Sequence, residues 1–149
     1  MHISDGYLGP PTSGFFYAVM LPIWAGASRI VKKTLRVKQV PVLAIGAAFS
    51  FVIMMFNVPI IAGSTGHAVG GVLVAILIGP WAACIAVTIA LAIQALLFGD
   101  GGITAFGANC FNMAFVMPFT GYYVYRALTF KTSADTNRRV FAAGIAGYI

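Results

Sequence analysis

The sequence predicts an all-α fold, a polytopic bundle of transmembrane helices that forms a single integral membrane domain over residues 1–149. Of the 149 residues, 60% are hydrophobic and only 8% are charged, with a mean hydropathy of +0.95. Roughly a quarter of the residues in soluble globular domains are charged, so this composition excludes that class. The Lys and Arg residues behind the net charge of +6 fall in two groups, 29–38 and 126–139. Such grouping is typical of membrane topology and not of nucleic-acid binding.

Apolar runs separated by glycine, proline and basic stretches define the expected helices. They cover residues 14–30, 40–56, 72–78, 81–98 and 108–129, and a sixth apolar run starts at residue 140. We expect Pro22 to kink the first helix, because proline removes a backbone donor inside a helix. The sequence ends within the sixth run, so we expect about five to six visible spans, the last of them truncated.

The third apolar run is too short to cross a membrane as a regular helix. Counted from His67 to Ile78 it has 12 residues, about 18 Å of helix against a hydrocarbon core of about 30 Å. The glycine-rich segment before it, residues 60–71, must therefore be irregular. Irregular backbone at membrane depth is tolerated where it is buried in protein or lines a cavity, as in the broken helices of transporters.

The distribution of charge predicts the orientation of the chain. Under the positive-inside rule both basic stretches face the cytoplasm, which requires an even number of crossings between them. The same count places the N-terminus, the loop at 57–66 and the loop at 99–107 together on the outer face. We therefore expect the N-terminus to lie outside and to fold into the bundle, with His2 and His67 on the same side.

The chain start offers a local metal chelate. It lacks the basic residue and following apolar run of a signal peptide, so we expect it to be retained. Histidine at position 2 is bulky, so Met1 should also stay, with a free amine. The Met1 amine, the His2 amide nitrogen and the His2 ring then form consecutive chelate rings. A fourth nitrogen can come from His67, the second of the chain's two histidines, so Met1, His2 and His67 are the predicted metal ligands.

Each histidine also has a simpler interpretation. His67 could be hydrogen-bonded within the bundle without a further task, and N-terminal residues such as His2 are often disordered. The metal interpretation rests on the pair, because ionisable side chains within spans usually mark function and both imidazoles are expected on one face. Four nitrogens in a plane suit Ni(II) or Cu(II), with Co(II) also possible, and nickel is the first choice.

Four further residues could orient the ligands: Asp5, Ser64, Thr65 and Asn109. Asp5 could accept a hydrogen bond from a ligand ring, or could serve the turn at Gly6. Asn109 could cap the fifth helix or bond the loop that carries His67, and capping is the simpler interpretation. Asp100, which two glycines follow, is expected to serve a turn.

Signs of other chemistry are weak. Four methionines could offer thioethers to copper, although packing is their simpler role: Met54, Met55, Met113 and Met117. Cys84 and Cys110 begin different helices on opposite sides of the membrane, so we expect them to lie beyond disulfide reach. The sequence contains neither a Gly-x-x-x-x-Gly-Lys nor a His-Glu-x-x-His motif, and its spans lack paired carboxylates. We therefore expect neither ATP hydrolysis nor another enzymatic activity.

Several motifs resemble one known family. They are Met1-His2-Ile3-Ser4-Asp5-Gly6, Gly63-Ser64-Thr65-Gly66-His67 and Gly99-Asp100-Gly101-Gly102 followed by Gly107-Ala108-Asn109. They are similar to those of the NikM/CbiM family, the nickel and cobalt substrate-binding (S) components of energy-coupling factor (ECF) transporters. The similarity runs along nearly all of the chain. It implies capture of Ni2+ or Co2+ from outside through the Met1 amine, the His2 amide and ring, and the His67 ring.

The resemblance also implies a multi-pass protein of the prokaryotic plasma (inner) membrane, with roughly seven helices when complete. The implied partners are a transmembrane coupling (T) subunit, two cytoplasmic ATPase subunits and a small auxiliary membrane subunit, as in an ABC-type importer. The metal is then the transported substrate, and no organic cofactor is implied. The alternatives are a structural or assembly subunit of a membrane complex and a copper-binding membrane protein. The sequence does not separate nickel from cobalt, because the same nitrogens serve both.

Overall fold

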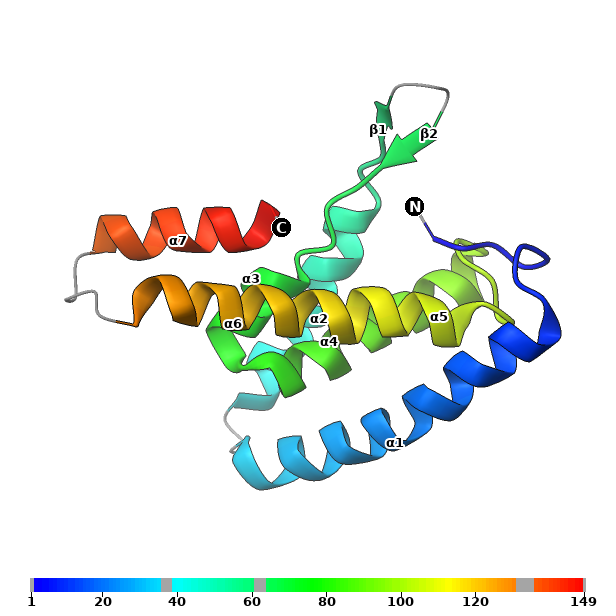
Figure 1. Ribbon diagram of the computed structural model, residues 1–149, viewed down its shortest axis with the longest axis horizontal. Helices are drawn as coiled ribbons and strands as arrows, with labels where there is room; N and C mark the ends of the chain where they lie inside the picture. The colour runs from blue at the N-terminus through cyan, green and yellow to red at the C-terminus, as the bar shows by residue number, and fades with distance from the viewer. Residues whose placement is uncertain (1, 36–38, 61–63, 131–135, 149) are drawn as a thin grey trace.

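The chain folds as a bundle of helices from which a short β-hairpin projects (Figure 1). The computed structural model describes residues 2–35, 39–60, 64–130 and 136–148. In chain order the elements are α1 (Pro10–Thr34), α2 (Val40–Met54), β1 (Val58–Ile60), β2 (Ser64–Gly66), α3 (Gly71–Ile78), α4 (Pro80–Ile93) with a π-helical extension (Gln94–Phe98), α5 (Phe106–Cys110), a π-helical segment (Phe111–Val116), α6 (Met117–Thr129) and α7 (Thr136–Tyr148). The prediction of a mostly helical fold is confirmed.

The hairpin is the departure from the all-α prediction. Val58 pairs with Gly66 and Pro59 with Thr65 in an antiparallel register. Valine favours extended backbone, and Pro59, which has no backbone donor, is tolerated because both strands of a two-stranded sheet are edge strands. In the described part of the predicted irregular stretch, residues 64–70 are non-helical, as expected, but residues 64–66 form a regular strand that the sequence analysis missed.

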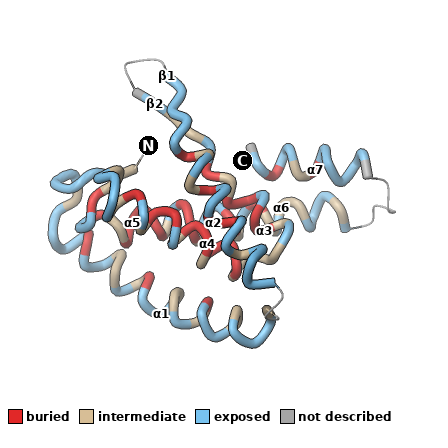
Figure 2. Tube along the Cα trace, turned by 180° about the vertical axis from the view of Figure 1, so that it is seen from behind, coloured by how far each residue is buried: buried red, intermediate tan, exposed pale blue. Residues whose placement is uncertain are grey.

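Helix α4 lies at the centre of the bundle. It packs against α1, α2 and α3 and against the helix formed by α5 and α6. Its small side chains are at most 4% exposed at Ala82, Ala83, Ala86 and Ala90, which lets the neighbouring helices approach closely. Figure 2 shows buried residues concentrated on the central helices, whereas α1 is largely exposed along its outer surface.

Proline and glycine set the helix boundaries that matter for the site. Pro10 is the first residue of α1. Backbone N–H groups in the first turn have no acceptor within the helix, so the N–H that proline lacks is not needed there. Gly79, at a φ of 91°, separates α3 from α4, and Pro80 begins α4 directly after it. This turn ends α3 after 8 residues, about 12 Å of helix. The predicted short third helix is confirmed.

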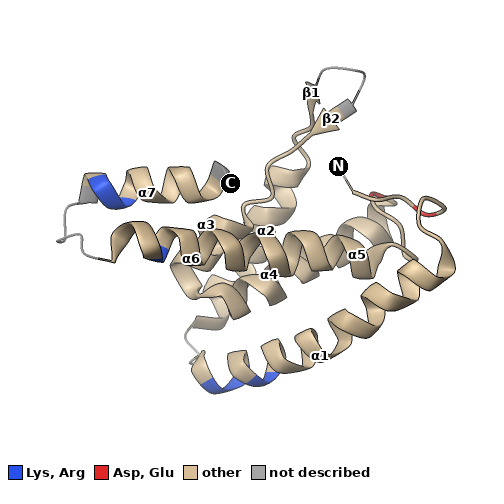
Figure 3. Ribbon diagram, viewed as in Figure 1, with Lys and Arg blue, Asp and Glu red and all other residues tan. Residues whose placement is uncertain are grey.

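Charges separate along the bundle (Figure 3). Described basic residues lie at the end of α1, near the end of α6 and at the start of α7, whereas Asp5 and Asp100 lie at the opposite end, beside the N-terminus. The described basic residues of the two stretches therefore share one end of the bundle, as the positive-inside rule requires of loops that face the same compartment.

Two helices of the described chain are long and apolar enough to cross a membrane. They are α1, at Pro10–Thr34, and α4 with its extension, at Pro80–Phe98. Helix α2 is also apolar, but it has only 15 residues. The number of spans therefore stays a prediction.

The two cysteines lie much closer together than predicted. Both are free and buried, and both thiols approach the hydroxyl of Thr88, which also accepts a hydrogen bond from the Trp24 indole at 3.1 Å. The expectation that they lie on opposite sides of the membrane is wrong. The connection after Phe98 folds back along α4, since Ile103 and Phe106 line a pocket with Ala92, Ala95 and Leu96. The end of α5 therefore reaches Thr88 in the middle of the helix formed by α4 and its extension.

Close packing of α3, α6 and α7 predicts a sensitive glycine. A Cβ atom at Gly121 in α6 would lie 2.5 Å from Val72 Cγ2 and 3.0 Å from the Ala146 carbonyl oxygen. We expect Gly121→Ala to lower the free energy of unfolding by about 1–3 kcal/mol. The Val72 side chain has few alternative rotamers, and the Ala146 backbone cannot move away from the added methyl group without distorting α7. Thermal unfolding in detergent would measure this. The control is Gly26→Ala in α1, where nothing lies within 4 Å of the added atom, and equal melting temperatures for the two variants would contradict the packing described here.

Candidate metal centre

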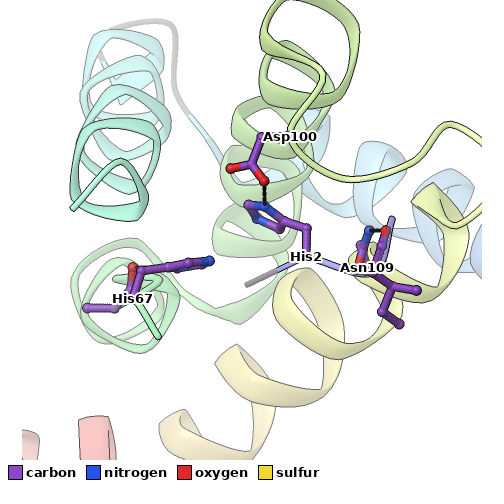
Figure 4. Close-up of polar contacts among 6 residues, drawn as sticks. His2, His67, Asp100 and Asn109 are labelled. Carbon is purple, nitrogen blue, oxygen red and sulfur yellow. Dashed lines mark hydrogen bonds and ion pairs between the residues drawn. The ribbon is translucent and has the colours of Figure 1, made fainter. Parts of the chain in front are cut away.

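The chain start folds back onto the connection between α4 and α5 (Figure 4). The Ile3 N–H donates to Asn109 Oδ1 at 2.9 Å, and Asn109 Nδ2 donates to the Ile3 carbonyl oxygen at 3.0 Å. The Gly102 N–H donates to the same oxygen at 3.0 Å. Asn109 is only 4% exposed. Each such bond contributes about 1 kcal/mol, and together they fix the backbone of one residue in place.

Two glycines leave the room that the chain start occupies. Gly101 has a φ of 88°, and a Cβ atom there would lie 3.0 Å from His2 Cβ. At Gly102 a Cβ atom would overlap Asp5 Oδ1 and the Asp5 nitrogen. Any larger residue at Gly102 would therefore displace the N-terminal segment, which explains why glycines follow Asp100.

Asp5 anchors the far side of the same segment. Its Oδ1 accepts hydrogen bonds from the backbone nitrogen and the hydroxyl of Thr104. The hydroxyl bond, followed by the backbone bond, holds the pKa of the Asp5 carboxyl below its ordinary value. The neighbouring Ile103 carbonyl accepts a hydrogen bond from the Tyr17 hydroxyl, which ties the connection to α1.

The His2 ring is enclosed by protein. Its side chain is 1% exposed, and its Nδ1 lies 2.9 Å from Asp100 Oδ1, on a carboxylate that is 42% exposed. Its Nε2 is buried without a hydrogen-bond partner among the described residues. A buried ring nitrogen that lacks a partner is costly unless something else binds it.

His67 follows the β2 strand and has one ring nitrogen available. Its Nδ1 lies 3.2 Å from the Ala68 carbonyl oxygen. A carbonyl can only accept, so this contact places the ring hydrogen on Nδ1 and leaves the lone pair on Nε2. That Nε2 is buried and has no hydrogen-bond partner within the described chain, which is the state a metal-ligating imidazole requires.

The two imidazoles lie side by side. Their ring centroids are 4.9 Å apart, with 42° between the ring planes, and Figure 4 shows the His67 ring directed toward His2. Metal–nitrogen bonds are about 2 Å long, so one ion could be shared by both rings after small movements. In the part of the chain that the structure describes, no three His, Cys, Asp or Glu side chains form a group that could hold a metal ion.

This contact, with those of His2 and Ile3 to Asp100 and Gly102, brings the chain start, His67 and the 99–107 connection together at one end of the bundle. Their location on the outer face stays a prediction. The remaining predicted residues are placed differently. Met1 and the side chain of Ser64 lie outside the described residues, and Thr65 is exposed on β2, opposite Pro59. Asp5 bonds Thr104 and not a ligand ring, which favours its local structural role. Asn109 neither caps α5 nor bonds the loop of His67; its described hydrogen bonds go to Ile3.

The sequence analysis missed the role of Asp100. It was assigned to a turn because Gly101 and Gly102 follow it, and the turn is real. The carboxylate nevertheless contacts the His2 ring. The available signal was its place in a loop predicted to share a face with both histidines, where an acid beside an imidazole is a common arrangement.

The methionines do not gather into a second centre among the described residues. Met54 and Met113 are buried in the apolar cluster around α4, whereas Met55 and Met117 are 47% and 36% exposed. These positions favour packing over copper ligation.

The anchoring role of Asp5 predicts how pH affects docking of the chain start. A carboxyl whose pKa is lower in the folded state stabilises that state above its ordinary pKa, here 3.8, and the contribution is lost as pH falls through the folded value. The contribution of Asp5 to docking should therefore be constant from pH 7 to 5 and be lost below about pH 4. Hydrogen exchange of the Thr104 amide, corrected for intrinsic rates, would measure it. Asp5→Asn should show the loosened state already at pH 7, and unchanged protection in that variant would contradict this role.

Comparisons of the sequence with known proteins agree on one family. The family model CbiM, described as a cobalt uptake substrate-specific transmembrane region, matches residues 2–149. The chain is 53% identical over 150 residues to a putative metal transport protein of Methanocaldococcus jannaschii, covering 100% of this chain and 65% of that protein. It is 51% identical over 148 residues to the fused nickel transport protein NikMN of Rhodobacter capsulatus, covering 99% of this chain and 43% of that protein.

A solved structure agrees with these relatives. The crystal structure of a truncated transition metal transporter superposes with a TM-score of 0.90 at 53% identity, over 99% of this chain and 67% of that one. The chain thus spans about two thirds or less of the length of these proteins. With a family match along its whole described length and a shared fold, the chain belongs to the CbiM family and is a membrane protein, as its motifs predict.

Proposed function

We propose that this chain captures Ni2+ or Co2+ at the outer face of the plasma membrane for ATP-driven uptake, as the substrate-binding component of an ECF-type transporter. The observation that carries the proposal is the pairing of His2 with His67, whose rings lie 4.9 Å apart although 65 positions separate them in the sequence. The names of the relatives, a cobalt uptake region and nickel transport proteins, support the choice of ion.

The ligands in this proposal are the Met1 amine, the His2 amide nitrogen, the His2 ring and the His67 ring. Chelation by the His2 amide and ring together requires Nδ1, because only that nitrogen closes a six-membered ring through Cα, Cβ and Cγ. The amine and the amide close a five-membered ring. His67 Nε2 completes the plane, which suits divalent nickel and cobalt.

Asp100 has a defined part in this site. A divalent ion bound by one deprotonated amide and three neutral nitrogens keeps a net charge of +1, and the His2 side chain that holds it is 1% exposed. Burying a net charge is costly unless an opposite charge lies nearby. The Asp100 carboxylate lies 2.9 Å from His2 Nδ1. It would supply that opposite charge when His2 Nδ1 binds the metal in place of the carboxylate.

Transport requires partners in this proposal, because the chain lacks a nucleotide-binding motif. They are a transmembrane coupling subunit, two cytoplasmic ATPase subunits and a small auxiliary membrane subunit. The fused nickel transport proteins among the relatives, of which this chain matches only part, support an additional unit next to this one. The basic stretches at the end opposite the site (Figure 3) support an orientation with the N-terminus outside.

Metal binding by the purified chain tests the proposal. We expect His2→Ala and His67→Ala each to lower the affinity for Ni2+ by more than about 100-fold, beyond the loss that residues supporting a ligand usually cause. Calorimetric titration of protein with an untagged N-terminus would measure it. Asn112→Ala, an exposed change, is the control. If both histidine variants bind Ni2+ as the wild type does, the chain has another function.

A second prediction concerns charge. We expect Asp100→Asn to weaken Ni2+ binding by about 10-fold, because the amide keeps the shape of the side chain and removes the charge beside the ion. The same titration measures this, with Asp135→Asn as a change of equal charge within residues 131–139. Tighter binding in Asp100→Asn would mean that the carboxylate competes with the ion for His2 and does not balance its charge.

A further inference from the structure

The hydrogen bonds to Ile3 all involve its backbone. Asn109 presents an acceptor to the Ile3 N–H and a donor to the Ile3 carbonyl oxygen, at 2.9 and 3.0 Å, just as a neighbouring β-strand would. The Gly102 N–H adds a third bond at 3.0 Å. Because no side-chain atom of Ile3 takes part, these bonds recognise a position along the chain and not a residue type.

The surrounding geometry makes that position unique. Gly101 lies against His2, and Gly102 lies against Asp5 so closely that a Cβ atom there would overlap it. Thr104 bonds the Asp5 carboxylate. Residues 2, 3 and 5 are therefore all contacted by the same short stretch, residues 101–109, and a shift by one residue would break these contacts together.

The tether that joins this segment to α1 makes little contact with the bundle. Gly6 and Gly9 are exposed, and Tyr7 is 82% exposed. A Cβ atom at Gly6 would meet nothing within 4 Å. The position of the chain start is therefore determined by its contacts with residues 101–109 and not by its covalent distance from Pro10, where α1 begins.

A metal site built on the chain start needs such accuracy. Two residues precede Ile3, and one residue of extended chain spans about 3.3–3.6 Å. A slip of that size exceeds a metal–nitrogen bond of about 2 Å, so it would move the chelate out of reach of His67 while leaving the chelate itself intact.

We propose that Asn109, Gly101 and Gly102 form a peptide-binding seat that holds the backbone at Ile3 and so sets, by counting back two residues, the position of the free amino end relative to His67. The ligand class of the seat is an extended peptide with an unblocked N-terminus two residues before the bonded one. Asn109 is then a positioning residue that acts through the chelate. The metal readout rests on the function proposed above.

Two insertions separate the seat from the tether. A glycine inserted after Tyr7 lengthens only the tether, so Ni2+ affinity should stay within about 3-fold of the wild type. A glycine inserted between His2 and Ile3 keeps the Met1–His2 chelate but moves it by one residue, so the affinity should fall to that of His67→Ala. Equal effects of the two insertions, large or small, would overturn the seat.

Substitution of Asn109 gives a second test. Asn109→Leu keeps the number and branching of the side-chain heavy atoms and removes both hydrogen bonds, and we expect a 10–100-fold loss of Ni2+ affinity. Asn112→Leu, the same change on an exposed neighbour, should bind as the wild type does. In a His67→Ala background Asn109→Leu should cost almost nothing more, because the fourth ligand is already absent. Full additivity of the two losses would show a general structural role and overturn the positioning role.

A metal-free readout separates this inference from the proposed function. Hydrogen exchange of the Ile3 amide reports occupancy of the seat without any ion. Protection should be lost in Asn109→Leu and kept in Asn112→Leu and in the insertion after Tyr7. If His67→Ala binds Ni2+ normally but this pattern holds, the proposed function fails and the seat stands. If His67→Ala loses Ni2+ but Ile3 stays protected in Asn109→Leu, the seat fails.

Discussion

The pair of hydrogen bonds between Asn109 and Ile3 is the contact on which the arrangement of the site depends. A free chain end loses conformational freedom when it docks, at a free-energy cost of about 1–2 kcal/mol for each residue whose backbone becomes fixed. Three backbone bonds at Ile3 and the Asp5–Thr104 pair offset that cost. Without them the first residues would behave as an ordinary terminus, and His2 would have no fixed relation to His67.

The second constraint is the short α3. Gly79 ends this helix after 8 residues, and the non-helical segment before it carries His67 toward the chain start. The connection after Phe98 folds back in a similar way, so that Cys110 at the end of α5 reaches Thr88 on α4. Two non-helical segments and the chain end therefore enter the same end of the bundle. Backbone of this kind is stable inside a membrane protein only where other segments satisfy its polar groups. Here the backbone of Ile3 bonds Asn109 and Gly102, and the His2 ring lies against that of His67.

The charged residues are also divided between the two ends of the bundle. Asp5 and Asp100 lie beside the chain start, and the described basic residues lie at the other end (Figure 3). The two acids have different tasks: Asp5 bonds Thr104 and holds the segment, whereas Asp100 contacts the His2 ring. One acid thus holds the N-terminal segment, and the other contacts an imidazole of the proposed metal site.

The sequence by itself determined the class of the protein, the short third helix, the grouping of loops at one end and the pairing of His2 with His67. Those follow from composition, helix length and loop charge, which are properties of segments and need no knowledge of contacts. Only the tertiary structure decided that Asp100 and not Asp5 meets the His2 ring, that Asn109 holds Ile3, that residues 58–66 include a hairpin, and that Cys84 and Cys110 approach the same hydroxyl. These features depend on how far each connection between helices folds back into the bundle. That distance is set by side-chain packing and by glycines such as Gly101 and Gly102, and it cannot be calculated from the spacing of residues in the sequence.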